Sequence, residues 1–215
     1  MGLKIPSAVM RKAAFVLGFA GALFATGLPA SAQGISLLRD TETEQLLRGY
    51  EVPLAKAAGL DPTAVHVYLI GDPTVNSFVA GGQNIFIQTG MILFAKTPNE
   101  LIGVMAHETG HIKAGHLVRG EVGMQKATIP MLLSLVAGLA AMVAGAGEAG
   151  MVIMSAGQAV AQAQFTSFTY VQEGTADQIA LRLLNATHQS PIGLYNTFQR
   201  FASEEAQHDV DYRPD

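Results

Sequence analysis

The stretch His107-Glu108-Thr109-Gly110-His111 has the residue types and spacing of a metal site on a helix. Residues four apart lie about 40° apart around a helix axis, so the two imidazoles share one face, one turn apart. Two imidazoles placed in this way can bind one zinc ion. Glu108 points about 100° away from His107, where it can serve as the general base of a metalloprotease rather than as a ligand. Because the pattern fixes only three positions, a chance match on a polar helix face is the alternative.

The residues before this motif predict a helix that begins at Pro98. Thr97 suits the N-cap, a proline at the first helical position loses no hydrogen bond, and Glu100 predicts a capping box. The predicted buried stripe consists of Leu101, Val104, Met105 and Ile112. Gly110 lowers helix propensity by about 1 kcal/mol. A glycine at this point is expected where another backbone or a substrate must come close.

A zinc site of this kind needs a third protein ligand. In the metzincin pattern it would be a histidine at position 117, which is Leu117 in this chain. His116 lies about 140° around the helix from His111, so it cannot join the same ion and is interpreted as a structural histidine.

A second helix, predicted at residues 165–184, supplies the remaining candidate for the third ligand. Glu173 and Asp177 are four residues apart on it and share a face. Glu173 can complete the zinc site, and Asp177 can accept the other ring N–H of a ligand histidine and fix its tautomer. A solvated acidic face is the alternative, which the apolar or small neighbours of this pair disfavour.

The segment before the motif predicts a helix and a small sheet. Residues 36–58 have a helical apolar stripe that ends at a plausible C-cap, Gly59, and residues 65–70 alternate as a strand. A hairpin with its turn at Gly81-Gly82 follows. Its second strand, Asn84 to Gln88, is interpreted as the edge strand beside the active helix. An extended substrate would pair there with Asn84, Ile85, Phe86 and Ile87. An ordinary hairpin is the alternative.

Residues 1–32 read as a secretory signal peptide, with a positive start, an apolar run and the small-residue cleavage site Ala30-Ser31-Ala32. An uncleaved anchor is the alternative. Cleavage would leave 10 Lys+Arg against 17 Asp+Glu, a formal net charge of −7. The chain has no cysteine, so disulfides and thiolate metal sites are excluded. It has no basic run either, which argues against nucleic-acid partners. These features predict a bacterial periplasmic protein with a domain at 33–215.

Several motifs together resemble the M48 peptidases, and with the signal peptide they are most similar to the periplasmic beta-barrel assembly-enhancing branch. The motifs are Glu100 to His111, His116, Glu173 to Asp177, Asn76-Ser77-Phe78 and Gly81-Gly82. The resemblance covers roughly residues 36–195. It implies a mainly helical α+β gluzincin domain with a small β-sheet. It also implies one zinc ion bound by His107, His111 and Glu173, with Glu108 as base, and proteolysis of misassembled envelope proteins, such as outer-membrane proteins.

The chain departs from that family in two respects. Where the family commonly has an arginine, three residues before the glutamate ligand, this chain has Tyr170, whose hydroxyl could stabilise an oxyanion. Periplasmic members often continue into a tetratricopeptide-repeat domain, whereas this sequence ends at Asp215. It is therefore interpreted as a short form or a fragment.

An apolar segment at 127–163 lies between the two predicted metal-binding helices. Ala127 to Gly147 carries no charge and is long enough to span a membrane. Its many glycines and alanines, Pro130 and the turn-like Gly145-Ala146-Gly147 instead predict a helical hairpin with a returning arm at 151–163. This hairpin is expected to pack on the domain or to touch a membrane surface. A true membrane span is the alternative.

Two classes of function fit these observations. The first is a zinc endopeptidase that cleaves misfolded envelope proteins. The second is a periplasmic chaperone or scaffold that keeps a structural zinc site. Glu108 favours the enzyme, because a structural zinc site has no use for a general base and closes its fourth position.

Overall fold

The computed structural model describes residues 36–211, apart from the side chains of residues 121, 122, 126 and 205–211. The predicted signal peptide at 1–32 lies outside the described residues. The chain divides into two compact units. We call the unit that comprises residues up to Ala114 and from Gly174 onward the sheet unit, and the unit at Gly115–Glu173 the hairpin unit. Their boundary falls inside one continuous helix, α6 (Gly147–Ala186).

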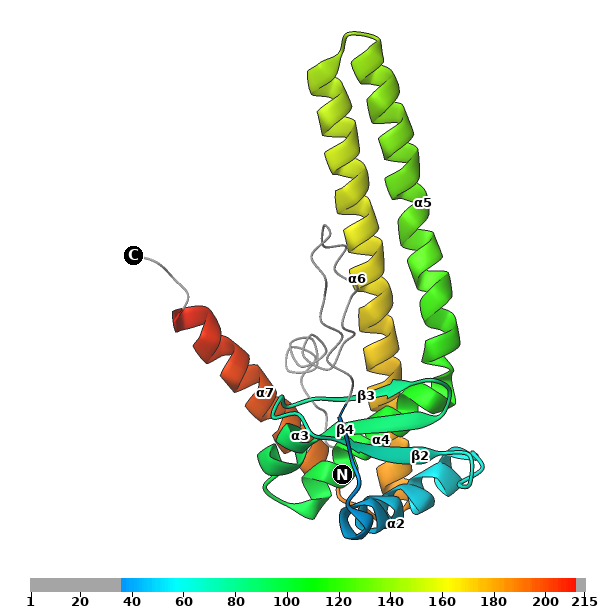
Figure 1. The fold of residues 1–215 in the computed structure, drawn as a ribbon, viewed down its shortest axis with the longest axis vertical. Helices are drawn as coiled ribbons and strands as arrows, with labels where there is room; N and C mark the ends of the chain where they lie inside the picture. The colour runs from blue at the N-terminus through cyan, green and yellow to red at the C-terminus, as the bar shows by residue number, and fades with distance from the viewer. Residues whose placement is uncertain (1–35, 212–215) are drawn as a thin grey trace. The chain divides into compact units, whose positions relative to one another are not determined.

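The sheet unit is a mainly helical α+β domain, which confirms the predicted fold class (Figure 1). Besides the end of α6, its elements are β1 (Leu37–Leu38), α2 (Thr41–Ala58), β2 (His66–Ile70), β3 (Ser77–Ala80), β4 (Asn84–Gln88), α3 (Thr89–Phe94), α4 (Pro98–Ala114) and α7 (Ile192–Asp211). The core lies where α2, α4, α7 and the end of α6 meet the sheet, and Leu54, Ile85, Met105, Leu184 and Leu194 are almost completely buried in it.

The strand order of the sheet is β1-β2-β4-β3. Strand β4 runs parallel to β2 and antiparallel to β3, and β1 is antiparallel to β2. The predicted hairpin is confirmed, with Gly81 and Gly82 at positive φ in its turn. The interpretation of Asn84, Ile85, Phe86 and Ile87 as an edge strand is wrong. Strand β4 has a partner on each side, and the edge strand that contacts α4 is β3.

The predicted helix at 36–58 begins later than expected. Leu37 and Leu38 pair with β2, and the helix starts at Thr41. Asp40 caps it, since a carboxylate oxygen accepts from the backbone N–H of Glu42 at 3.1 Å and of Thr43 at 3.3 Å. Pairing with a distant strand overrides the local helical pattern here. The predicted C-cap, Gly59, is confirmed by its φ of 70°.

Helix α4 begins at Pro98, as predicted. The amide of Glu100 donates to Thr97 Oγ1 at 3.3 Å, as an N-cap requires. The carboxylate of Glu100 does not close the predicted capping box. Instead it accepts from the Lys96 amide at 2.8 Å and forms a two-pronged ion pair with Arg200 of α7. The hydrogen bonds from Arg200 lower the pKa of Glu100. This contact joins α7 to the first turn of the helix that carries the metal motif.

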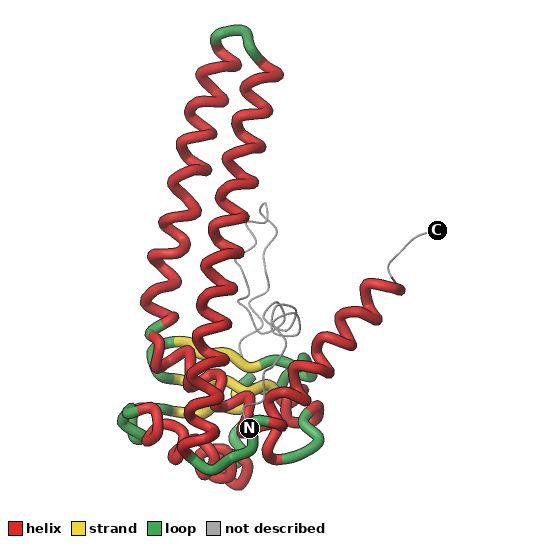
Figure 2. Tube along the Cα trace, turned by 180° about the vertical axis from the view of Figure 1, so that it is seen from behind, coloured by secondary structure: helices red, strands yellow, loops and turns green. Residues whose placement is uncertain are grey.

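The hairpin unit consists of α5 (His116–Val143) and the first part of α6, which lie side by side in both views (Figures 1 and 2). The turn between them contains Gly145 at φ 85°. Small residues line the contact between the two helices. A Cβ on Gly138 would lie 2.7 Å from the carbonyl oxygen of Gly150, and one on Gly157 would overlap Ser134. Among the described residues, α5 is the helix whose length and apolarity would suit a membrane crossing.

Candidate metal centre

Helix α4 is buried from Glu100 to Gly110, so its polar motif lies inside the protein. His107 is 2% exposed, and His111, one turn on, is partly buried. Their Nε2 atoms are 3.1 Å apart, and their rings meet edge-on at 63°. Two nitrogens bound to one zinc ion at about 2.0–2.1 Å with tetrahedral geometry are about 3.3 Å apart. The two imidazoles therefore converge as a pair of ligands would.

The orientation of His107 is fixed by two other elements. Its Nδ1 lies 2.9 Å from a carboxylate oxygen of Asp177 on α6, with both side chains buried. Because a carboxylate accepts, the proton of a neutral His107 belongs on Nδ1, and its Nε2 lone pair faces His111. Phe198 of α7 packs edge-on against the same ring, at a centroid distance of 5.7 Å and an angle of 87°. The sequence interpretation found Asp177 and missed Phe198.

Glu173 brings the third candidate ligand. One ligand atom from each of His107, His111 and Glu173 can be chosen so that all three lie within 4.8 Å of one another, and Glu173 is 6% exposed. Helix α6 can approach α4 this closely because of Gly110. A Cβ at Gly110 would lie 2.7 Å from the backbone oxygen of Ala176. The close backbone approach predicted from this glycine is therefore confirmed.

Glu108 lies beside this group, 3% exposed, and its Oε1 accepts a hydrogen bond of 2.7 Å from Ser77 Oγ. Ser77 is fully buried on the edge strand β3. This bond fixes one oxygen of the carboxylate and connects the edge strand to the motif helix α4. Ser77 is 31 residues away in the sequence, and no local spacing linked it to Glu108.

A further buried carboxyl group contacts the motif from helix α2. Glu51 of α2 is 2% exposed, and its Oε1 is 2.9 Å from Thr109 Oγ1. The pKa of Glu51 is raised to about 8, mainly by burial and to a smaller extent by the nearby Glu108, against the lowering effect of the Thr109 hydrogen bond. Thr109 Oγ1 also lies 2.7 Å from the carbonyl oxygen of Met105. A hydroxyl has one proton, so both contacts are satisfied when protonated Glu51 donates to Thr109 and Thr109 donates to Met105. The sequence alone suggested no role for Glu51.

Tyr170 is 42% exposed on α6, one turn before Glu173. Its role as an oxyanion stabiliser stays a prediction.

Residues 41–208 match the sequence profile of Peptidase family M48. The chain belongs to this family. The resemblance to the M48 peptidases is therefore confirmed. The matched residues include both helices that supply the His-His-Glu group.

Curated relatives agree with this assignment. The chain is 29% identical over 142 residues to the beta-barrel assembly-enhancing protease of Yersinia pestis, and 25% identical over 155 residues to that of Escherichia coli K12. These matches cover 66% and 72% of this chain but only 29% and 32% of the relatives. It is also 29% identical over 144 residues to the metalloprotease LoiP of Escherichia coli, covering 67% of this chain and 53% of LoiP. The chain thus spans about a third to a half of the length of these relatives.

The donor set fits zinc. Two imidazole nitrogens and one carboxylate are a ligand set of catalytic zinc sites, which leave the fourth position open. The Asp177 contact to His107 is the outer hydrogen bond that metal-ligating histidines almost always make.

Proposed function

We propose that this chain is a zinc-dependent endopeptidase of the cell envelope that hydrolyses misfolded or misassembled exported proteins. The observation that carries the proposal is the convergence of His107, His111 and Glu173 beside a buried carboxylate, Glu108, that is hydrogen-bonded to the edge strand. A structural zinc site would need a fourth protein ligand and no adjacent base.

In this proposal His107, His111 and Glu173 hold one zinc ion per chain. When bound, zinc supplies Lewis acidity, which polarises the scissile carbonyl and makes water a stronger acid. Glu108 takes the proton from the attacking water and later gives it to the leaving amine. Ser77 holds Glu108 Oε1, which leaves Oε2 for this proton transfer. Tyr170 is the candidate for hydrogen bonding to the developing oxyanion.

The substrate strand is assigned to the edge of β3 that has no strand partner among residues 36–211. This strand is outermost in the sheet and contacts α4, so an extended polypeptide added to it would lie along the motif helix. The hydrogen bond from Ser77 on β3 to Glu108 supports this assignment. The earlier candidates on β4 are excluded by its central position in the sheet.

The envelope location rests on the predicted signal peptide and on the names of the relatives, which include beta-barrel assembly-enhancing proteases. Unassembled outer-membrane proteins are the proposed substrates.

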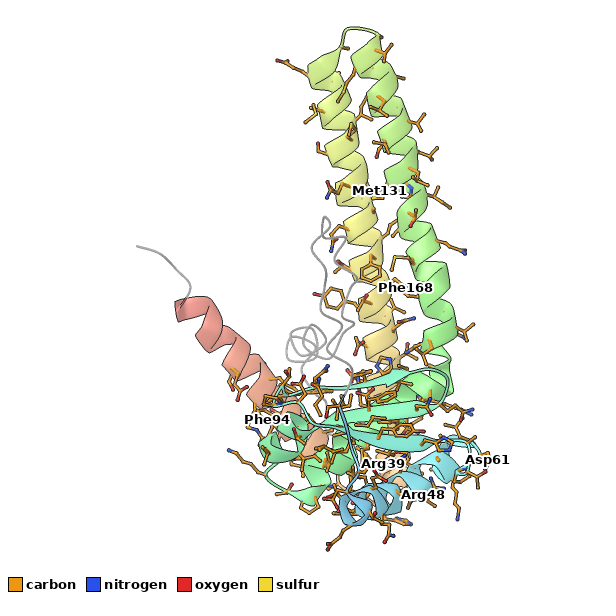
Figure 3. All side chains as sticks on the ribbon, in the orientation of Figure 1. Arg39, Arg48, Asp61, Phe94, Met131 and Phe168 are labelled. Atoms are coloured by element: carbon orange, nitrogen blue, oxygen red, sulfur yellow. The ribbon has the colours of Figure 1, made fainter. Side chains whose placement is uncertain are left out.

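We also assign a membrane contact to residues 127–163 of the hairpin unit. Large apolar side chains project from both of its helices (Figure 3). Between Lys126 and Glu173 the sequence has one charged residue, Glu148, in the first turn of α6. The side-chain hydroxyls of Ser134 and Ser155 donate to carbonyl oxygens of their own helices. Such internal bonds satisfy polar groups in an apolar medium, where water cannot.

The test of the enzymatic proposal compares Glu108→Gln with His107→Ala in zinc content and casein cleavage. Gln keeps the size of Glu but cannot accept the proton, so Glu108→Gln should keep one zinc per chain and lose about 10²–10⁴ in rate. His107→Ala should lose both zinc and cleavage. Near-normal turnover by Glu108→Gln would overturn the mechanism. Stoichiometric zinc without any chelator-sensitive cleavage by the wild type would instead favour a scaffold.

A further inference from the structure

Three aromatic rings form a continuous stack across the face of the sheet opposite to its core. Tyr68 on β2 stacks on Phe86 of β4 with a centroid distance of 5.3 Å and an angle of 23°, and Phe86 stacks on Phe78 of β3 at 5.1 Å and 17°. All three side chains are half-buried, whereas their strand neighbours Ile85 and Ile87 point into the core. The stack runs towards the outermost strand and ends there, at Phe78.

The register of β3 decides what a strand added to its free edge would meet. The Gln88 amide donates to the Asn76 carbonyl, and Phe78 stands opposite Phe86. Hydrogen-bonded and non-hydrogen-bonded pairs alternate in an antiparallel ladder. Phe78, two residues after Asn76, therefore forms a hydrogen-bonded pair with Phe86, and its backbone N–H and C=O groups point towards β4. The N–H and C=O groups of Ser77 and Val79 consequently point away from β4, towards the free edge.

A polypeptide that pairs with Ser77 and Val79 places one residue directly opposite Phe78, in a non-hydrogen-bonded pair. The Cα atoms in such pairs are only about 4.5 Å apart, so the side chains touch. That side chain lies on the outer face with Phe78. The residues before and after it turn to the other face, where Ser77 holds Glu108.

We propose that Phe78 is a specificity-determining residue that binds an aromatic side chain of the extended substrate, as the next ring in the stack Tyr68–Phe86–Phe78. This inference rests on the proposed peptidase function and on the assignment of substrate to β3. It predicts that the selected aromatic residue is the immediate neighbour of a residue that faces Glu108. Face alternation is the same for a parallel and an antiparallel substrate, so this spacing holds in both orientations.

The substrate class that follows is an extended segment with aromatic residues at alternate positions. Strands of transmembrane β-barrels alternate apolar and polar residues and carry aromatic girdles on their outer face. Before assembly these strands have unpaired edges, which makes them fit partners for the edge of β3.

The experiment uses zinc-loaded protein and a series of short peptides of Thr and Ser, in which a single Phe is moved through successive positions. Cleavage sites are located by mass spectrometry, and kcat/KM is compared with that of the matched peptide that has Ser in place of Phe. One register of Phe should raise kcat/KM about 2- to 12-fold, the range typical of an aromatic pair. Phe78→Ser should bring this ratio close to 1, and Phe78→Leu should leave an intermediate ratio.

Tyr68→Ser is the matched control, because Tyr68 lies on the same face but two strands away from the edge, and it should keep the ratio. A wild-type ratio near 1 in every register, or a ratio that survives both Phe78 variants, would overturn the inference. Equal loss in Tyr68→Ser would also overturn it, since the effect would then come from the sheet as a whole.

Binding of the same peptides to zinc-loaded Glu108→Gln, followed by fluorescence anisotropy, separates this inference from the peptidase proposal. If no peptide is cleaved by the wild type, the peptidase proposal fails. Phe78 is still the recognition residue if the Phe peptide binds more tightly than the Ser peptide, Phe78→Ser removes that difference and Phe78→Leu reduces it. Equal binding of both peptides would overturn the inference independently of catalysis.

Discussion

The two units of this protein arrange polar and apolar groups in opposite ways. The sheet unit buries charged and polar side chains, including His107 and Glu108 at 2% and 3% exposure, within its apolar core. The hairpin unit exposes apolar ones, such as Leu133 at 67% and Val143 at 91%, and keeps glycines at its helix contact. Buried polar groups are tolerated where they have hydrogen-bond partners. Exposed apolar groups are tolerated where the surroundings are themselves apolar.

The contacts within each unit fit this difference. In the sheet unit, buried polar side chains of the motif bond to other elements, as His107 does to Asp177 and Glu108 does to Ser77. In the hairpin unit, the hydroxyl of Thr128 donates to its own helix, at the carbonyl of Met124. Small residues at a helix contact with large apolar residues outside are typical of helices packed in lipid.

Removal of a candidate metal ligand should have the largest effect. Glu173→Ala leaves two histidines, so zinc content should fall well below one per chain. Asp177→Ala keeps all three ligands but frees the His107 ring, and it should weaken zinc binding by about 10–100-fold. Zinc titration against a competing chelator measures both. Stoichiometric, tightly held zinc in Glu173→Ala would show that the ligand set is wrong.

A charge on the outer face of the hairpin should have the next largest effect. Leu133→Glu should lower partitioning into lipid vesicles by roughly 10- to 100-fold, because a buried leucine contributes about 1.5–3 kcal/mol. Leu93→Glu is the matched control. Leu93 is 84% exposed on α3 of the sheet unit, and its replacement should leave partitioning unchanged. If both variants bind vesicles as well as the wild type, the hairpin does not make the membrane contact.

Two helical glycines near the metal group allow a sharper test of close packing. Gly110→Ala should lower the free energy of unfolding by about 1–3 kcal/mol, because its Cβ would press on the backbone of α6. A Cβ on Gly174 would meet nothing within 4 Å, so Gly174→Ala should be neutral or stabilise by up to about 1 kcal/mol through helix propensity. Urea unfolding compares the pair. Similar effects of the two substitutions would contradict the close approach of the helices.

Much of the candidate metal centre could be predicted because its information is local. His107 and His111, and then Glu173 and Asp177, each recur at four-residue spacing on one helix, so periodicity alone gives their faces. The hairpin around Gly81 and Gly82 is local in the same sense. These elements were predicted from short stretches of sequence, and the structure brings the four side chains together.

The features that were missed depend on pairing between distant segments. Strand β3 is outermost because β4 pairs in parallel with β2 on its other side. No turn sequence indicates this parallel pairing. Ser77 and Glu51 reach the motif from 31 and 58 residues away. A serine in a strand and a glutamate in an amphipathic helix are most often solvated, so nothing in their neighbourhood marked them as buried.

Replacement of Glu51 should have the smallest effect of these changes. It tests whether the buried carboxyl group of Glu51 is protonated in the folded sheet unit. Its pKa of about 8 lies above the ordinary value of 4.5, so between these values the folded protein holds a proton that the unfolded chain has released. Stability should therefore fall as pH rises through this window, by about 1.4 kcal/mol per pH unit from this group, and its contribution is lost above pH 8. Glu51→Gln resembles the protonated acid and cannot ionise, so it should lose this part of the pH dependence.

The measurement is urea unfolding of the wild type and Glu51→Gln between pH 5 and pH 9, on zinc-loaded protein, with the difference between the two curves as the readout. That difference removes the pH dependence of zinc binding, which both proteins share. Thr109→Val is the control: it removes the hydroxyl that contacts Glu51 but keeps the buried carboxyl. This control should be less stable at every pH yet keep the slope of the wild type. A Glu51→Gln protein with the full wild-type slope would show that Glu51 is ionised in its buried position, and Thr109 would then donate its one hydroxyl proton to Glu51 rather than to the carbonyl of Met105.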